Sequence, residues 1–213
     1  LQHGLAALAV FARSYGADHP HVGRILNLVG AVYFDSHDYV RARDFFERAL
    51  ANSLQTLGPD HPTVAIRLNN LALVYEQEGR FEEALAAQRR ALAIEEAAYG
   101  GDHPQIAIGY SNLGILLRSA GKLADGYQAH LRSVAISEAT MEADNPDLGV
   151  SIAEMADSLA DLGRYQEALE AHRRGHAILE KAVGADHDWT LSARLGSARD
   201  LLEFRRAPYG RGR

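Results

Sequence analysis

A tripeptide recurs along this chain at a fixed spacing of 42 residues. Asp-His-Pro begins at Asp18, returns at Asp60 and Asp102, and degrades to Asp-Asn-Pro at Asp144 and to Asp-His-Asp at Asp186. Equal spacing without a single insertion indicates an internal repeat, and periods of 20–50 residues are typical of solenoids. The repeat therefore constrains the fold more than any other feature of the sequence.

Each period is predicted to contain two helices, most clearly in the second repeat. The tripeptide supplies a polar capping residue and a proline for the first turn, where no amide hydrogen is required. Leu68, Leu71, Ala72 and Tyr75 then follow at the spacing of one helical face, and Gly79 ends this helix. A second apolar face follows and indicates a second helix. This helix ends at a glycine, which we expect in a left-handed conformation. The positions of this second helix are Phe81, Ala84, Leu85, Ala91, Leu92, Ile94 and Gly100.

Small residues recur at one position of the first helices, where we expect two helices to approach closely. This position holds Gly30, Ala72, Gly114 and Ala156. No window alternates with a period of two, so strands are not expected. A single helical hairpin cannot bury its apolar face alone, whereas a stack of hairpins can. The sequence thus predicts an all-α solenoid of antiparallel helix hairpins.

The repeat sets the expected organisation of the chain. Residues 1–17 match a second helix only, full repeats span 18–59, 60–101, 102–143 and 144–185, and a capping helix spans 186–204. In the capping helix we expect the apolar stripe to move to Leu191, Leu195, Ala198 and Leu202. The basic tail, residues 205–213, is expected to be disordered. Because the chain starts within a repeat and without Met, we expect a piece of a longer protein.

Charge and composition exclude several classes of partner. The net charge is −6, and four arginines in the tail leave −6 − 4 = −10 for residues 1–204, so nucleic acid is not expected to bind. No apolar run approaches the roughly 20 residues that span a bilayer, so no membrane partner is expected. The chain has no cysteine, which excludes disulfides and thiol nucleophiles. We expect a cytoplasmic protein.

The pattern resembles the tetratricopeptide repeat, and the 42-residue period with Asp-His-Pro resembles its kinesin-light-chain type. The resemblance covers residues 1–204 and implies a right-handed superhelix whose first helices line the concave side. The residues that carry it in the second repeat are Leu68, Asn69, Asn70, Leu71, Ala72, Tyr75, Gly79, Arg80, Phe81, Ala84, Ala91 and Leu92.

The resemblance also implies a binding site for a protein or peptide in the concave groove. Asn70 and Asn112 would pair with the backbone of an extended ligand, because an amide side chain both donates and accepts hydrogen bonds. Leu73 and Ile115 would supply apolar contact. The full set of candidate ligand-binding residues is Asn27, Phe34, Asn69, Asn70, Leu73, Glu76, Ser111, Asn112, Ile115, Arg118 and Asp157.

The sequence departs from the family pattern in two repeats. Glu154 stands where Asn70 stood, and Leu28 stands there in the first repeat. The amide positions are therefore concentrated in the second and third repeats. Only Arg24 and Arg118 are candidates for holding a ligand's terminal carboxylate, so a chaperone-tail ligand is not favoured.

Histidines and the one tryptophan have structural interpretations that compete with functional ones. The histidines of the tripeptide are interpreted as part of helix starts rather than as metal ligands, because sites one repeat apart do not converge on one ion. His172 and His176 lie four residues apart, as metal-binding pairs do, but a loosened packing seam at Gly175 is favoured. Trp189 is expected to pack at the end of the stack.

These observations favour a protein-binding scaffold that is not an enzyme and has no cofactor, since no set of reacting groups converges. We expect it to be the recognition part of a larger regulatory protein. Two alternatives stay open: a self-associating structural module that forms homo-oligomers through its end repeats, and a sensor arm of a multidomain NTPase or protease regulator.

Overall fold

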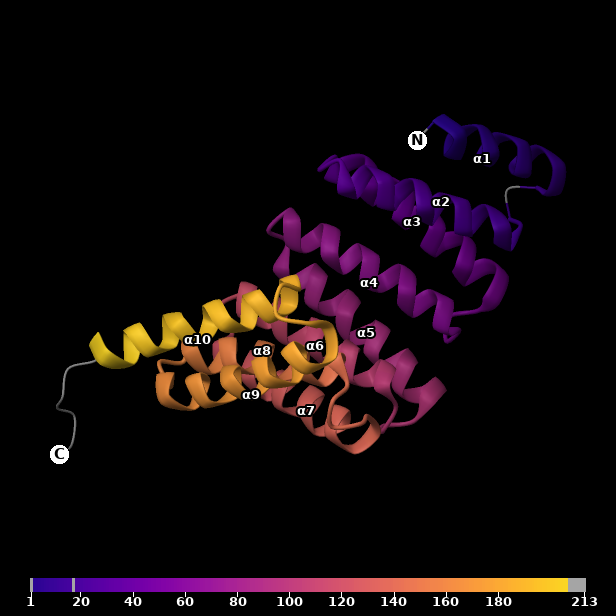
Figure 1. Ribbon diagram of the computed structural model, residues 1–213. Helices are drawn as coiled ribbons and strands as arrows, with labels where there is room; N and C mark the ends of the chain where they lie inside the picture. The colour runs from indigo at the N-terminus through magenta and orange to yellow at the C-terminus, as the bar shows by residue number, and fades with distance from the viewer. Residues whose placement is uncertain (1, 17, 207–213) are drawn as a thin grey trace. The chain divides into compact units, whose positions relative to one another are not determined.

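Helices form almost all of the part of the chain that the structure, a computed structural model, describes: residues 2–16 and 18–206 (Figure 1). No strand occurs among those residues, so the prediction of an all-α fold is confirmed. None of the helices in these ranges is both long and apolar enough to cross a membrane. The helices are α1 (Gln2–Tyr15), α2 (Pro20–Asp35), α3 (Tyr39–Leu57), α4 (Pro62–Gln77), α5 (Phe81–Tyr99), α6 (Pro104–Ser119), α7 (Leu123–Thr140), α8 (Pro146–Asp161), α9 (Tyr165–Val183) and α10 (Asp188–Arg206).

The recurring tripeptide starts helices, as predicted, and its second residue makes the cap. The Nδ1 atom of His61 accepts a hydrogen bond from the backbone N–H of Thr63 at 3.1 Å, and a proline follows as the first helical residue. In the fourth repeat the Oδ1 atom of Asn145 accepts the same bond from Asp147 at 2.8 Å. The change from His to Asn therefore conserves an acceptor that satisfies an open amide. The equivalent bond is also made by His19, His103 and His187.

Glycines end helices where the backbone requires a positive φ. Gly100 follows α5 with a φ of 82°, which side chains other than glycine rarely adopt. Its ψ of 164° nevertheless places it outside the left-handed helical region expected from the sequence. Gly79, after α4, also has a positive φ, of 72°.

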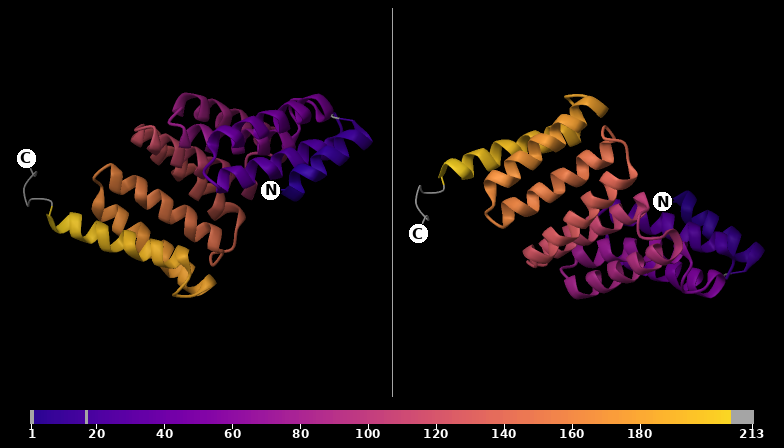
Figure 2. Two further views of the ribbon diagram at one scale, coloured as in Figure 1. Left: turned by 90° about the horizontal axis from the view of Figure 1, so that it is seen from above. Right: turned by 90° about the horizontal axis from the view of Figure 1, so that it is seen from below.

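The chain divides into two compact units, residues 1–100 and residues 101–213. In the first unit, consecutive helices from α1 to α5 pack on one another, as Figure 2 shows from two further directions. Val64 and Leu68 of α4 pack against Ala91 and Ile94 of α5, within one hairpin. Between hairpins, Phe46 of α3 joins a core cluster with residues of α2 and α4. In this unit α3 thus contacts the first helix before it, α2, and the first helix after it, α4.

The second unit repeats this arrangement from α6 to α10. A close helix approach occurs at Gly114 of α6, where an added Cβ would lie 2.4 Å from the His130 ring of α7. Gly30 in the first unit plays the same part, with the Phe46 ring 2.7 Å from an added Cβ. The expectation of a close approach at this position is confirmed at both glycines.

The packing of α10 differs from the prediction. Its buried residues are Thr190, Ala193, Gly196 and Asp200, whereas Leu195 is 71% exposed. The helix presents to α9 and α8 the same face as every earlier first helix, while Leu195 lies on the side that each earlier repeat covers with its own second helix. The helix also runs to Arg206, two residues beyond the predicted end. The rest of the predicted tail, residues 207–213, lies outside the described residues.

Gly175 does not loosen the packing of α9, contrary to the expectation. A Cβ added at Gly175 would lie 2.9 Å from the carbonyl oxygen of Gly149 and 3.3 Å from the backbone nitrogen of Ala153. The glycine therefore permits a close contact between α9 and α8, since any side chain there would meet backbone atoms.

Candidate functional site

The first helices of the second unit form a face with two pockets. α8 packs against both α6 and α10, so the three first helices lie in a row. On this face side chains point away from the core. On α6, for example, Ile108 is 44% exposed and Ile115 is 36% exposed. We call this surface the groove face of the second unit, and define it by Ile108, Asn112, Ile115, Val150, Glu154, Asp157 and Ser192.

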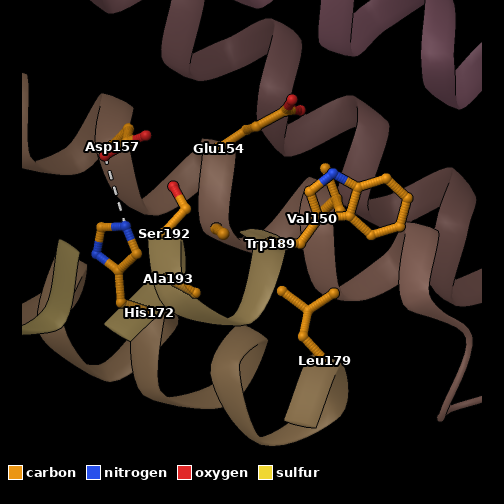
Figure 3. Close-up of a pocket in the computed structure, with 9 residues that line it drawn as sticks. Val150, Glu154, Asp157, His172, Leu179, Trp189, Ser192 and Ala193 are labelled. Atoms are coloured by element: carbon orange, nitrogen blue, oxygen red, sulfur yellow. Dashed lines mark ion pairs between the residues drawn. The ribbon is translucent and has the colours of Figure 1, made fainter. Parts of the chain in front are cut away.

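The larger pocket, of about 210 Å³, lies between α8 and α10 and is called the tryptophan pocket (Figure 3). It is lined by Val150, Ala153, Glu154, Asp157, His172, Leu179, Trp189, Ser192 and Ala193. The residues of α10 that line it include the small side chains of Ser192 and Ala193. Ser192 stands where α6 has the larger Ile108.

The smaller pocket, of about 120 Å³, lies between α6 and α8 and is called the amide pocket. It is lined by Ala107, Ile108, Ser111, Asn112, Ser137, Met141, Asp147, Val150, Ser151 and Glu154. Val150 and Glu154 line both pockets, so the two cavities are neighbours along the groove face. A ligand lying across the first helices would meet both.

A charged network surrounds Asp157 at the edge of the tryptophan pocket. The Asp157 carboxylate lies 2.7 Å from Arg199 and 3.5 Å from the Nε2 atom of His172 (Figure 3 marks the latter pair). The Nδ1 atom of His172 lies 2.6 Å from the buried Asp200 carboxylate. Burial opposes ionisation of Asp157, but the hydrogen bonds with His172 and Arg199 outweigh burial and lower its pKa to about 2.

His172 responds to the same network in the opposite direction. Burial alone would lower the pKa of His172, but its hydrogen bonds to Asp157 and Asp200 raise the pKa above the ordinary value. The ring is therefore held between two carboxylates. His176, the other half of the predicted pair, lies instead 3.9 Å from Glu180 on its own helix.

Glu154 is the carboxylate of the groove face that has no cationic partner. Its Oε2 atom accepts a hydrogen bond from the Ser111 hydroxyl. No Lys, Arg or His among the described residues forms an ion pair with it, and Arg118 is paired with Asp161 at 2.7 Å. Burial, the largest cause, and the nearby Asp157 charge raise the pKa of Glu154 above its usual range, although the Ser111 hydrogen bond and the Arg118 charge act in the opposite direction.

The first unit presents an equivalent face on α2 and α4, which pack against each other. It is more apolar: Leu28 is 65% exposed, Ile66 is 50% exposed and Leu73 is 47% exposed. We call these three residues, together with Asn70, the groove face of the first unit.

Several predicted site residues form hydrogen bonds or ion pairs with a neighbouring first helix. Asn70 donates a hydrogen bond to Asn27 at 2.7 Å, and Ser111 bonds to Glu154. Arg118 bridges from α6 to Asp161 of α8. In each pair the partners are 43 residues apart, so they occupy facing positions of neighbouring repeats. These side chains therefore stabilise the stack of first helices in addition to facing the groove.

The other predicted residues differ in where their side chains lie. Leu73, Asn112 and Ile115 lie on the groove faces, and no hydrogen bond of the Asn112 side chain is found among the described residues. Phe34 and Asn69 point elsewhere: Phe34 packs against the core of the first unit, and Asn69 donates to Glu95 of α5 at 3.4 Å. Glu76 is half-buried.

Sequence reasoning missed the α10 side of the site, which is Trp189, Ser192 and Arg199. The signal was present, because Ser192 and Arg199 continue the 42-residue register of Val150 and Asp157. The sequence predicts a capping helix here, and a capping helix is not expected to contribute side chains to a groove. Trp189 was expected to pack at the end of the stack, yet it is 45% exposed and lines the pocket.

Comparison with protein families finds one model along most of the chain. The tetratricopeptide repeat model matches residues 1–55, 24–97, 63–139 and 105–181. No match was found among curated proteins.

Solved structures share the fold. A crystal structure from Podosopora anserina, of kinesin light chain nearly identical TPR-like repeats, is 23% identical with a TM-score of 0.75, covering 89% of this chain and 90% of that one. BtubC (BKLC) from P. vanneervenii is 25% identical with a TM-score of 0.70, covering 79% of this chain and 67% of that one. The likeness to the Podosopora anserina repeats shows the fold alone.

Proposed function

Because the chain belongs to the tetratricopeptide repeat family, a family of non-catalytic scaffolds typical of protein–protein interaction modules, we propose that the groove face of a single unit binds a peptide segment of a partner protein. The observation that carries this proposal is the exposed set of apolar side chains beside an amide pocket. Apolar side chains on a surface favour burial by a partner, and the Asn112 amide can both donate to and accept from a peptide backbone. The binding role would be exercised in the cytoplasm, within a larger regulatory protein.

The proposal assigns different tasks to the residues of the face. In the second unit Ile115 contributes apolar area, while Asn112 fixes the direction and spacing of an extended backbone; in the first unit Leu73 contributes the apolar area. Asn70 has its oxygen and one N–H available after donating to Asn27, so it contributes in the same way as Asn112.

The test selects peptides from a random library on the immobilised chain and then compares variants. Ile115→Ser should weaken binding of a selected peptide by about tenfold, as expected for the loss of a central apolar contact. Leu131→Ser is the matched control, because Leu131 is similarly exposed, at 42%, but lies on the second-type helix α7. Equal weakening by both substitutions, or a failure to select any peptide, would contradict groove binding.

A second candidate function, self-association, is favoured by the unmatched faces of α1 and α10. Val10 of α1 is 61% exposed, although its equivalent Ile94 packs against the first helix of its own repeat. Leu195 and Leu202 of α10 are 71% and 55% exposed on the side that a repeat's own second helix covers elsewhere. α1 of one copy would thus pack on the side of α10 of another copy that carries Leu195 and Leu202.

A further inference from the structure

The tryptophan pocket combines an aromatic wall, a carboxylate and a floor of apolar side chains. Trp189 of α10 and Glu154 of α8 line it, with Val150 beside them and the buried Leu179 below (Figure 3). The pocket opens on the groove face, since Ser192 at its rim is exposed. The indole and the acid thus line the same cavity.

The two acids of the pocket differ in what they can still bind. Arg199 and His172 already neutralise Asp157. Glu154 accepts only from the neutral Ser111 hydroxyl and has no ion pair among the described residues. A carboxylate that is largely removed from water costs free energy unless a cation or further hydrogen bonds compensate. Glu154 is therefore the carboxylate of this pocket with which a cationic group of a ligand can still pair.

We infer that the tryptophan pocket binds an arginine side chain of the partner peptide, an assignment that rests on the proposed groove function. The guanidinium pairs with the Glu154 carboxylate and its plane lies against the Trp189 ring. Because Glu154 also lines the amide pocket, the peptide continues from the arginine over α8 toward Asn112 of α6.

Arginine fits this combination better than other side chains. A guanidinium is planar, stacks on aromatic faces and donates to a carboxylate through two N–H groups, whereas a lysine ammonium is a compact and strongly hydrated charge. An acidic side chain would be repelled by Glu154. An apolar side chain would leave Glu154 without a counter-charge.

Trp189 provides a direct measurement, because it is the only tryptophan of the chain. The probe is the capped tripeptide acetyl-Gly-Arg-Gly-amide, titrated while the indole emission is recorded. The control replaces arginine by citrulline, which has nearly the same shape without the charge. We expect a saturable change in emission with arginine and at least about tenfold weaker binding with citrulline, as for the loss of a charge-assisted pair.

Two substitutions that each remove one negative charge test whether the arginine binds at Glu154. Glu154→Gln retains the acceptor for Ser111 and should weaken the arginine tripeptide by about tenfold. Glu142→Gln, at an exposed position in the loop before α8, should leave binding unchanged. Thermal unfolding of both variants shows whether the fold is intact. If Glu154→Gln does not fold, Trp189→Ala at its partly exposed position is measured by calorimetry and should lose binding similarly.

The outcomes separate this inference from the proposed function. Equal binding of the citrulline or the lysine tripeptide, or unchanged binding to Glu154→Gln, would overturn the arginine assignment while leaving groove binding of selected peptides unaffected. Conversely, arginine binding with no effect of Ile115→Ser on any selected peptide would support the pocket and contradict the groove.

Discussion

His130 and His172 occupy the same place in successive repeats, yet their surroundings drive their pKa values apart. Each ring lies between its hairpin and the next first helix. His130 bonds to the Ser158 hydroxyl at 2.7 Å, whereas His172 bonds to the Asp200 carboxylate. Burial, with a contribution from Arg118, lowers the pKa of His130 to about 4. One histidine is thus held neutral, while the other is favoured in its charged form.

The pKa of His130 predicts a loss of stability in mild acid. The folded state binds a proton on His130 less tightly than the unfolded chain does. The contribution of neutral His130 to the free energy of unfolding is therefore complete above the ordinary histidine pKa of about 6.5, and it is lost as the pH falls toward 4. Between about pH 7.5 and about pH 5 the loss amounts to roughly 2 kcal/mol. Urea unfolding at both pH values should show that the free energy of unfolding falls by roughly 2 kcal/mol more in the wild type than in His130→Gln, because the other titrating groups are common to both proteins.

Glutamine is the appropriate replacement because Gln88 occupies the equivalent buried position in the second repeat. If the free energies of unfolding of the two proteins fall in parallel with pH, the assignment of the acid sensitivity to His130 is wrong. His172 acts in the opposite sense: its raised pKa stabilises the fold at low pH, and this stabilisation is lost as the pH rises through the raised value.

At the scale of the element, each first helix depends on one side-chain acceptor at its start. His61 provides it for α4 and Asn145 provides it for α8. His61→Ala should lower the free energy of unfolding by about 1 kcal/mol, the usual cost of losing a cap. His61→Asn should lose much less, because the chain itself uses asparagine at this position.

Asp60→Ala tests whether the aspartate of the tripeptide contributes to the helix start in addition to the capping histidine. Asp60 is exposed and precedes the capping residue, so its removal should change stability by only a few tenths of a kcal/mol. Chemical unfolding of the three variants provides the comparison. A cost at Asp60 equal to that at His61 would show that the aspartate, not the histidine, carries the start of the helix.

The second helices show how a repeat conserves position while changing chemistry. Phe46, Gln88, His130 and His172 are equivalent and all buried. In three of the four repeats the residue 28 positions later changes with it: Val74 follows Phe46, Ser158 follows His130 and Asp200 follows His172, whereas Leu116 follows Gln88. An apolar contact is thus replaced by a hydrogen bond and then by a charged pair, since a buried polar group requires a partner.

At the scale of the whole molecule, the unmatched faces of α1 and α10 predict head-to-tail association. Sedimentation equilibrium should show a mass that increases with concentration, because a contact between two different surfaces can be repeated from copy to copy. Leu195→Ser combined with Leu202→Ser should reduce the mass to that of a single chain. Leu131→Ser, on the exposed side of α7, is the control. A wild-type mass that does not change with concentration would rule out this contact.

The sequence by itself determined the helices, their starts and the small residues at the close approaches of Gly30 and Gly114. These features depend on short-range periodicity and on a spacing that repeats along the chain. Tertiary structure alone decided which groove side chains bond to the neighbouring first helix, as Asn70 does with Asn27. It also decided which face of α10 is buried and that Trp189, Glu154 and Ser192 line one pocket. The physical reason is that burial and pairing depend on the neighbouring helix, whose position no local pattern specifies.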